Sequence, residues 1–328
     1  MANIVFVDSH ITGSDHPCFA TMRETFEKAG HVFFQESCKS REEVLEKTAH
    51  AHAIITTYTP LDREILRNAP ELKMAMRNAI GYEILDIAAG TELGIPICNI
   101  PDYCTEEVAT HTMALILACA RKLKPSAELV RAGTWKIVCG YPIDRLSTQT
   151  LGLIGFGRIA KLVAGYAKAF GMTIIAHDPF IPADVFAEHG VEGVSLDDLY
   201  ARSDIISVGA PLTSENRHMI NAASIAKMKD GVILVNTGRG PLIATDDLIA
   251  ALESGKVKAA GLDVLEEEPL RDADAKILSL DNVILTSHIG YDSQQAIWDN
   301  FDKAAKTVLA TLAGELPYNV LNLKELEK

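Results

Sequence analysis

Short apolar runs and longer stretches with helical spacing alternate along the chain. Near its middle, an apolar run over Leu151–Ile154 precedes helical spacing over Lys161–Phe170, and a β-rich run follows over Thr173–Ala176. This order predicts a strand, a tight turn, a helix and a second strand. Such a βαβ unit places its two strands side by side and parallel.

Further apolar runs extend this pattern on both sides of the central unit. Four more strands are expected after it, each ending in a polar residue or glycine, at Asp204–Val208, Val232–Asn236, Ala259–Val264 and Val283–Thr286. Before it, strands are expected at Ile4–Val7, Ala53–Thr57, Lys73–Arg77 and Ile95–Cys98, with a helix over Cys18–Ala29. The chain is therefore predicted to be an α/β protein with two doubly wound parallel-sheet domains that meet near residue 101.

The turn inside the central unit carries a glycine motif. Gly155 permits the tight turn, Gly157 lets the backbone approach a pyrophosphate, and Ala160 is small enough to pack the helix on the strand. Asp178 follows Gly157 by 21 positions (178 − 157) and ends the next strand, where its carboxylate can accept hydrogen bonds from ribose hydroxyls. A carboxylate repels a 2′-phosphate, so NAD is favoured over NADP. A purely structural glycine turn is the alternative.

Composition narrows the classes of partner. With 328 residues and 48% hydrophobic content, the chain can bury two cores. Its formal net charge of −13 argues against nucleic acid and an anionic membrane as partners. No apolar run is long enough to span a bilayer. Neither a signal peptide nor a metal-ligand spacing is recognised, so a reducing cytoplasm and no metal are expected; the six cysteines are Cys18, Cys38, Cys98, Cys104, Cys119 and Cys139.

Three strand ends carry the side chains best suited to catalysis. Arg239 can grip a carboxylate and polarise the adjacent keto oxygen. His288 can give a proton to a developing alkoxide, or remove one in the reverse reaction, with Glu268 stabilising its imidazolium. Taken singly, each is more often a solvated arginine, a surface glutamate in the acidic run Glu266–Glu268, or a capping histidine. Their joint occurrence past strands of one NAD domain favours the catalytic interpretation.

The motifs together resemble those of the D-isomer-specific 2-hydroxyacid dehydrogenases, and the resemblance covers nearly the whole chain. The matching stretches are Gly155-Phe156-Gly157-Arg158-Ile159, Pro211-Leu212-Thr213, Val235-Asn236-Thr237-Gly238-Arg239-Gly240, Gly261-Leu262-Asp263-Val264, Glu268-Pro269 and Ser287-His288-Ile289-Gly290.

The resemblance implies a role for each matching residue. It makes Arg239 the substrate-orienting arginine, His288 the acid/base and Glu268 its partner. The implied cofactor contacts are Gly155, Gly157, Arg158, Ile159, Asp178, Pro211, Thr213, Thr237, Asp263 and Gly290. The implied substrate contacts are Arg77, Ala79, Ile80 and Gly81, with backbone N–H groups meeting the substrate carboxylate; Tyr291, where many relatives have a small residue, is expected to narrow the pocket.

The same resemblance implies the domain arrangement. A Rossmann NAD-binding domain over 102–290 is expected to be inserted in a flavodoxin-like substrate domain formed by 1–101 and 291–328. A helix and arm over 102–145 are expected to form a homodimer interface. The arm includes Pro125–Tyr141, which is predicted to lack regular structure; a segment of this length usually packs on another surface, and a dimer partner is one candidate.

The expected function is NAD-dependent interconversion of a small 2-keto acid and its D-2-hydroxy acid. Arg77 and the run Pro101–Glu107 resemble the branch that contains C-terminal-binding proteins and phosphoglycerate dehydrogenase-like reductases. Glyoxylate, hydroxypyruvate and phosphohydroxypyruvate remain unranked as substrates. The alternative is an NAD(H)-responsive binding protein with little turnover. Formate dehydrogenase chemistry is disfavoured because it has no hydroxyl proton for a His–Glu pair to move.

Overall fold

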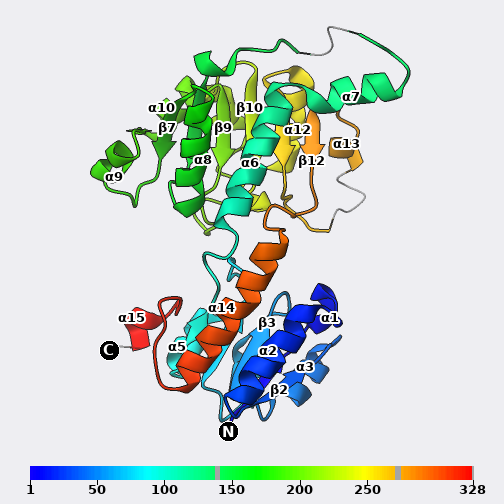
Figure 1. Cartoon of the computed structure of the whole chain (residues 1–328). Coiled ribbons are helices and arrows are strands. Elements are labelled where there is room, and N and C mark those ends of the chain that lie inside the picture. Colours follow the sequence, from blue (N-terminus) through cyan, green and yellow to red (C-terminus); the bar gives the residue numbers. More distant parts are fainter. Residues whose placement is uncertain (137–140, 270–274, 327–328) are drawn as a thin grey trace. The chain divides into compact units, whose positions relative to one another are not determined.

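The chain forms two compact units in the computed structural model, which describes residues 1–136, 141–269 and 275–326. The first unit is Met1–Cys104 with Asp292–Lys328, and the second is Thr105–Tyr291 (Figure 1). Both divisions lie within three residues of the boundaries expected at 101 and 291. Cys139 falls outside the described residues.

The first unit contains a five-stranded parallel sheet in the order β2-β1-β3-β4-β5. Its strands are β1 (Asn3–Phe6), β2 (Val32–Gln35), β3 (Ala53–Thr56), β4 (Met74–Arg77) and β5 (Ile97–Cys98). This strand order is the flavodoxin-like one. The sequence did not predict β2, which is one of the two edge strands and buries only one of its four residues.

Helices cover both faces of this sheet. On one face lie α2 (Pro17–Lys28) and α14 (Gln294–Leu312), and on the other α3 (Arg41–Thr48), α4 (Arg63–Asn68) and α5 (Ile87–Glu92). The short helices are α1 (Ser9–Thr12) and α15 (Leu323–Leu326). The C-terminal tail packs on the same unit, because Asn322 Oδ1 accepts the N–H of Ile97 at 2.9 Å.

The second unit contains a seven-stranded parallel sheet in the order β12-β11-β10-β9-β6-β7-β8. Its strands are β6 (Thr150–Ile154), β7 (Thr173–His177), β8 (Glu192–Gly193), β9 (Ile205–Val208), β10 (Val232–Asn236), β11 (Val257–Leu262) and β12 (Val283–Leu285). Counted from β6, its first six strands have the Rossmann order, with the change of direction between β6 and β9. The two-residue β8 was not predicted.

Both faces of this sheet are buried. Along β10, Ile233 and Val235 face one apolar cluster while Val232 and Leu234 face the other, which explains why its strands read as nearly continuous apolar runs. One face carries α6 (Thr105–Ala120), α8 (Arg158–Ala169) and α9 (Ala183–Glu188); the other carries α10 (Leu196–Arg202), α11 (Ala222–Lys227) and α12 (Thr245–Ser254). Three shorter helices of this unit are α13 (Ala275–Leu278), η1 (Leu146–Thr148) and η2 (Gly240–Leu242). The predicted α/β fold with two parallel sheets is confirmed.

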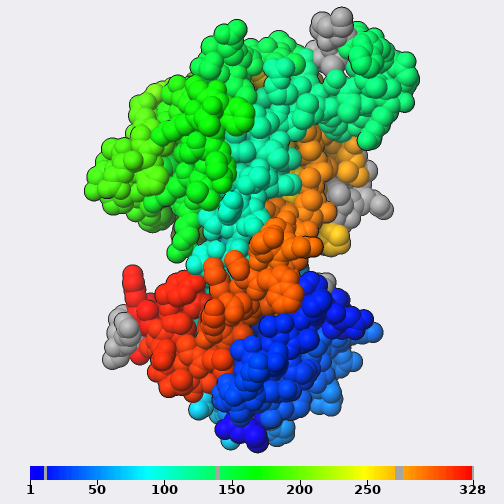
Figure 2. Space-filling view, viewed as in Figure 1, coloured from blue at the N-terminus to red at the C-terminus, as the bar shows by residue number. Residues whose placement is uncertain are grey.

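One prediction for the second unit was wrong. The segment Pro125–Tyr141, expected to lack regular structure, begins inside α7 (Leu123–Arg131), which lies at the surface of this unit (Figure 2). Residues 137–140 of that segment lie outside the described residues. Pro125 occupies the first turn of α7, where no intrahelical hydrogen bond needs its missing N–H. The apolar residues of α7 gather on one face of the helix, but none of its residues is buried. The helical periodicity is therefore present in the sequence, and the prediction overlooked it. Across the described ranges, no helix has the length and apolar character needed to cross a bilayer.

Candidate active site

The glycine turn lies where the strand order of the second unit changes direction. Gly155, which follows β6, has φ +87°, in the left-handed region that favours glycine. A Cβ at this position would lie 3.0 Å from backbone atoms of Gly209 and Ala210, which follow β9. Only glycine therefore allows the ends of β6 and β9 to approach this closely, at the place where α/β sheets bind ligands.

The N-terminus of α8 is open for an anionic group. The helix begins at Arg158, and its N-cap residue Gly157 supplies no side-chain cap. A Cβ on Gly157 would meet no atom within 4 Å, so there is space in front of the first N–H groups. Unpaired N–H groups and the positive end of the helix dipole suit a pyrophosphate. The residues present thus fit a dinucleotide.

Asp178 is fixed beside this turn at the end of β7. Its Oδ2 accepts the N–H of Phe156 at 2.9 Å, and its Oδ1 accepts the N–H of Phe180 at 3.0 Å. These bonds hold the carboxylate next to the glycine turn. Each carboxylate oxygen can accept a further hydrogen bond, as contact with ribose hydroxyls requires.

Arg239, Glu268 and His288 follow the adjacent parallel strands β10, β11 and β12. The Nδ1 atom of His288 lies 2.7 Å from Oε2 of Glu268, so the structure brings these two side chains into direct contact. Arg239 Nη1 donates to the carbonyl of Gly238 at 2.8 Å. The arginine lies in the neighbouring loop, which follows β10.

The Glu268 carboxyl is kept ionised by its surroundings. Partial burial alone would raise its pKa, but the hydrogen bond from His288, the charge of the imidazolium and the N–H of Leu265 outweigh it. The resulting pKa lies below the ordinary range for glutamate.

Asp263, at the end of β11, holds the backbone of the histidine loop. Its carbonyl accepts the N–H of His288 at 2.8 Å. Its carboxylate accepts the N–H groups of Ile289 at 3.0 Å and Gly290 at 2.9 Å, and the hydroxyl of Thr286 at 2.5 Å. Burial would raise the pKa of this 3% exposed carboxyl, yet these donors and His111 hold it well below its usual range. His288 adopts a left-handed φ of +57°, which these bonds stabilise.

The sequence analysis missed three residues that support this site, namely His111, Thr112 and Thr286. His111 Nε2 lies 3.0 Å from Thr286 Oγ1 and 3.3 Å from Asp263 Oδ1. The hydroxyl of Thr112 lies 2.7 Å from that of Thr237. The available signal was a pair of polar residues within the apolar helix α6, because polar groups on a packed helix face require partners.

The other predicted cofactor residues lie in the loop after β9. Thr213 donates its N–H to Asn216 Oδ1 at 2.8 Å, and Asn216 Nδ2 donates to the carbonyl of Pro211 at 2.7 Å. These bonds give the exposed loop a defined shape. Tyr291, the last residue of the second unit, is half-buried.

The predicted substrate loop of the first unit follows β4. Arg77 is not a solvated surface arginine: its side chain is 15% exposed, its Nε donates to the carbonyl of Thr57 at 2.8 Å, and Nη1 lies 3.2 Å from Glu83. Donors of the same unit also bond to the backbone carbonyls of the three residues that follow Arg77. Asn300 Nδ2 donates to the carbonyl of Asn78, the N–H of Ile100 to that of Ala79, and Asn99 Nδ2 to that of Ile80, at 3.0, 2.9 and 2.6 Å respectively.

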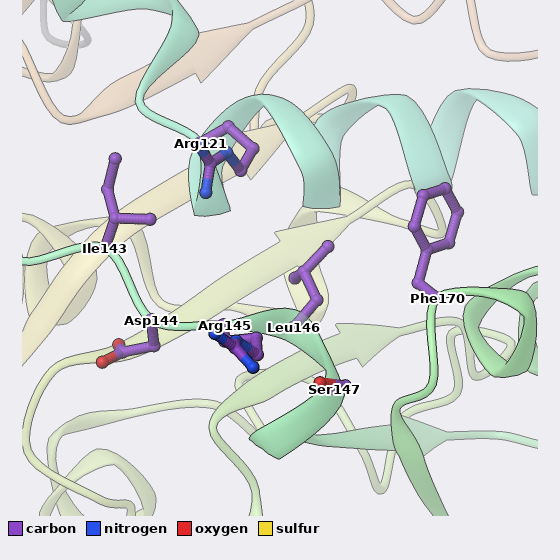
Figure 3. A pocket seen from close by; sticks show the side chains of 7 residues that line it. All are labelled: Arg121, Ile143, Asp144, Arg145, Leu146, Ser147 and Phe170. Atoms are coloured by element: carbon purple, nitrogen blue, oxygen red, sulfur yellow. The ribbon is translucent and has the colours of Figure 1, made fainter.

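A pocket of about 420 Å³ lies elsewhere in the second unit (Figure 3). Its lining includes Arg121 at the end of α6, Arg145 and Leu146 just before β6, and Phe170 just before β7. These residues precede their strands, so the pocket lies at the amino ends of the sheet, opposite to the edge that bears the glycine turn and His288. Over the described ranges, no cluster of three or more His, Cys, Asp or Glu side chains could hold a metal ion.

Comparison with known proteins identifies the family. The model of the D-isomer specific 2-hydroxyacid dehydrogenase NAD-binding domain matches residues 113–290. A glyoxylate reductase of Thermococcus litoralis is 38% identical over 289 residues, which cover 85% of this chain and 86% of that protein. The chain belongs to the D-isomer specific 2-hydroxyacid dehydrogenases.

Two further relatives of this dehydrogenase extend the comparison. A D-3-phosphoglycerate dehydrogenase of Methanocaldococcus jannaschii is 40% identical over 294 residues, covering 88% of this chain and 55% of that protein, so the chain spans slightly more than half of its length. The structure of a D-lactate dehydrogenase from Aquifex aeolicus, complexed with NAD and lactic acid, matches with a TM-score of 0.84 and 32% identity over 99% of this chain and 98% of that one.

The predicted family, enzyme class and cofactor are confirmed by these matches. The chain is an NAD-dependent oxidoreductase that interconverts a 2-keto acid and the corresponding 2-hydroxy acid.

Proposed function

We propose that this dehydrogenase reduces a small 2-keto acid to its D-2-hydroxy acid with His288 as the acid/base, Glu268 as its partner and Arg239 as the carboxylate-binding residue. The observation that carries the proposal is the 2.7 Å contact of His288 with Glu268 at the carboxyl ends of parallel strands, one loop away from Arg239. Ligands bind at this edge in α/β sheets.

The contact assigns separate tasks to the two imidazole nitrogens. Nδ1 carries a proton toward the Glu268 carboxylate, which leaves Nε2 to exchange a proton with the substrate oxygen. The Arg239 guanidinium can hold the substrate carboxylate through two parallel hydrogen bonds. NADH supplies the hydride when bound. The chain's own task is to orient the carbonyl, neutralise the carboxylate and deliver the proton.

The cofactor would be held along the carboxyl edge of the sheet. The open N-terminus of α8 and the close approach of β6 to β9 support pyrophosphate binding by Gly155, Gly157, Arg158 and Ile159. The fixed carboxylate of Asp178 supports recognition of the ribose. The remaining proposed contacts are Pro211, Thr213, Thr237, Asp263 and Gly290. The bond of Asp263 to Gly290 and that of Thr237 to Thr112 support the proposal that these two residues also shape the groove.

In the first unit, Ala79, Ile80 and Gly81 would meet the substrate carboxylate through their N–H groups. The inward-facing carbonyls of residues 78–80 support this proposal, since they are bonded to donors of the same unit. No described residue accepts a hydrogen bond from the N–H of Ile80 or Gly81. Such adjacent N–H groups form an anion-binding concavity.

Glyoxylate, hydroxypyruvate and phosphohydroxypyruvate are the candidate substrates. Each presents the carboxylate and carbonyl that Arg239 and His288 require. Two relatives, named glyoxylate reductase and D-3-phosphoglycerate dehydrogenase, carry names that refer to acids of this type. Arg77 would favour an additional polar or anionic group on the substrate, while Tyr291 would limit its size. Initial rates with each acid and NADH, followed by NADH absorbance, rank them.

The decisive test compares the wild-type chain with His288→Ala. Loss of the general acid is expected to lower turnover about a hundredfold or more, while NADH binding stays near the wild-type value. NADH fluorescence titration measures the binding and absorbance measures the turnover. Tight NADH binding without turnover of any small keto acid would instead indicate an NAD(H)-responsive binding protein.

A homodimer through the arm over 102–145 is also proposed. The exposed apolar side chains of Leu123 and Val130 on α7, at 57% and 50%, together with Trp135 at 87%, support a contact that buries this surface. Light scattering on the wild type and Val130→Glu tests the proposal, since a charge in the contact would favour the monomer.

A cytoplasmic location is proposed on the five described cysteines, which are buried thiols without disulfides.

A further inference from the structure

A second histidine–glutamate pair lies in the loops beside the proposed catalytic one. His218 lies in the loop between β9 and α11, and its N–H donates to the carbonyl of Pro241 at 2.8 Å. Two residues later, the carbonyl of Ile220 accepts the N–H of Ala244 at 2.8 Å. The backbone around His218 is therefore tied to the segment that follows Arg239.

The side chain of His218 reaches across to a third loop. Its Nε2 forms a hydrogen bond with Oε1 of Glu266, in the loop after β11. The other carboxylate oxygen, Oε2, accepts the N–H of Thr245 at 2.8 Å, at the start of α12. Glu266 thus uses one oxygen to join its loop to the loop after β9 and the other to join it to the start of α12, where the segment that contains Arg239 ends.

These loops also touch through their backbones. A Cβ on Gly240 would lie 1.7 Å from the carbonyl oxygen of Leu265 and 2.6 Å from the nitrogen of Glu266, so neither backbone can move toward the other. Arg239 immediately precedes this contact, and Glu268 follows Glu266 by two residues. The His218–Glu266 pair therefore fastens the loop of Arg239 to the loop of Glu268, at points a few residues from each of them in the sequence.

We propose that His218 and Glu266 are positioning residues that fix the loop of Arg239 against the loop of Glu268, and so set the substrate carboxylate at the correct distance from the proton donor His288. The inference rests on the proposed function, because it takes the roles of Arg239, Glu268 and His288 from it. Neither member of the pair needs to touch substrate or cofactor.

The local geometry favours positioning over a solvated surface pair. His218 has a φ of +55°, a conformation that is uncommon for residues other than glycine and persists only where the surrounding structure imposes it. The side chains are 41% and 22% exposed, and ion pairs with such exposure contribute little to stability. Small misplacements of binding groups, in contrast, reduce rates strongly.

Hydrogen exchange followed by mass spectrometry tests the fastening itself in the full chain. His218→Ala removes the side-chain bond, and His218→Gln retains a donor that can reach Glu266. Arg217→Gln is the matched control, since Arg217 lies 3.6 Å from the same carboxylate oxygen and is 55% exposed. We expect exchange about tenfold faster in 239–245 and 265–268 for the Ala variant only, as for a local opening. Unchanged exchange there overturns the proposal.

Steady-state kinetics with glyoxylate and hydroxypyruvate test the consequence. For His218→Ala, KM for the keto acid should rise about tenfold, kcat should fall less, and the Kd for NADH should stay within about twofold, as loose orientation of the substrate predicts. The Gln variant should recover most of this loss. An Ala variant with unaltered KM and kcat overturns the positioning role, even if its Tm is lower.

The two proposals fail in different ways. If the wild type reduces no keto acid, or if His288→Ala is fully active, the proposed function fails, and hydrogen exchange alone decides whether the pair fastens the loops. If His288→Ala is inactive while His218→Ala resembles the wild type in every measurement, only the present inference fails.

Discussion

Two histidine–glutamate pairs occupy the same edge of the same sheet, and the histidine of each has a positive φ, +57° for His288 and +55° for His218. Their glutamates, Glu268 and Glu266, are only two residues apart. The two pairs therefore have the same residue types, the same left-handed backbone at the histidine, and a direct contact between the two side chains. The pairs cannot be told apart by composition or by pairing alone.

Their remaining contacts differ. Both oxygens of Glu266 bond to other loops, at His218 and at Thr245. Glu268 uses Oε2 for His288 and Oε1 for the N–H of Leu265, within its own loop. Glu266 thus links its loop to two other segments, whereas Glu268 reaches one other loop, that of His288, and otherwise bonds within its own loop. The comparison teaches that a residue's links to the surrounding backbone distinguish positioning from proton transfer.

The sharpest test of this difference neutralises each glutamate. Glu268→Gln is expected to lower kcat about tenfold to a hundredfold, because the imidazolium of His288 loses its stabilising charge. Glu266→Gln should affect KM for the keto acid more than kcat. Parallel steady-state kinetics with one keto acid provide the measurement. Equal losses of kcat in both variants would remove the proposed distinction.

A smaller loss of turnover is expected when the support of the catalytic histidine is altered. Asp263→Asn leaves at least one N–H of the His288 loop facing an amide NH₂, which should cost about 2 kcal/mol of unfolding free energy and lower kcat about tenfold. Urea unfolding and kinetics measure these effects. Unchanged stability and kcat would show that the carboxylate does not hold this loop.

The pH dependence of stability provides a separate check on Asp263. Its folded-state pKa is below the ordinary value, so its contribution is fully present above the unfolded-state pKa and is lost as pH falls from about 4 toward the folded-state pKa. The difference in unfolding free energy between wild type and Asp263→Asn should therefore narrow in acid. A constant difference between pH 7 and pH 3 would contradict this account.

The smallest effect on turnover is expected far from both pairs. Asp178→Asn should weaken NADH binding severalfold and relax discrimination against NADPH, because the charge that repels a 2′-phosphate is removed. The ratio of kcat/KM for the two cofactors measures it. The same variant should leave the pH profile of kcat unchanged, and an unaltered cofactor ratio would refute the ribose assignment.

Much of the fold was predictable because the signals are local. Buried parallel strands produce apolar runs, and the glycine turn with Asp178 needs only the residues of one βαβ unit. The helix α7 was missed although its apolar residues gather on one face. The strands β2 and β8 were missed because they lie at the edges of their sheets, where few residues are buried. Without a buried face, the pattern of apolar residues weakens.

The sequence by itself determined the two α/β domains, the NAD fingerprint and the three strand ends that carry Arg239, Glu268 and His288. Only the tertiary structure decided that Glu268 contacts His288, that Asp263 and His111 support the histidine loop, and that Glu266 bonds to His218 instead of extending into solvent. These contacts join residues 20 to more than 150 positions apart. The folding of neighbouring strands into one sheet brings them together, and no local pattern encodes such distances.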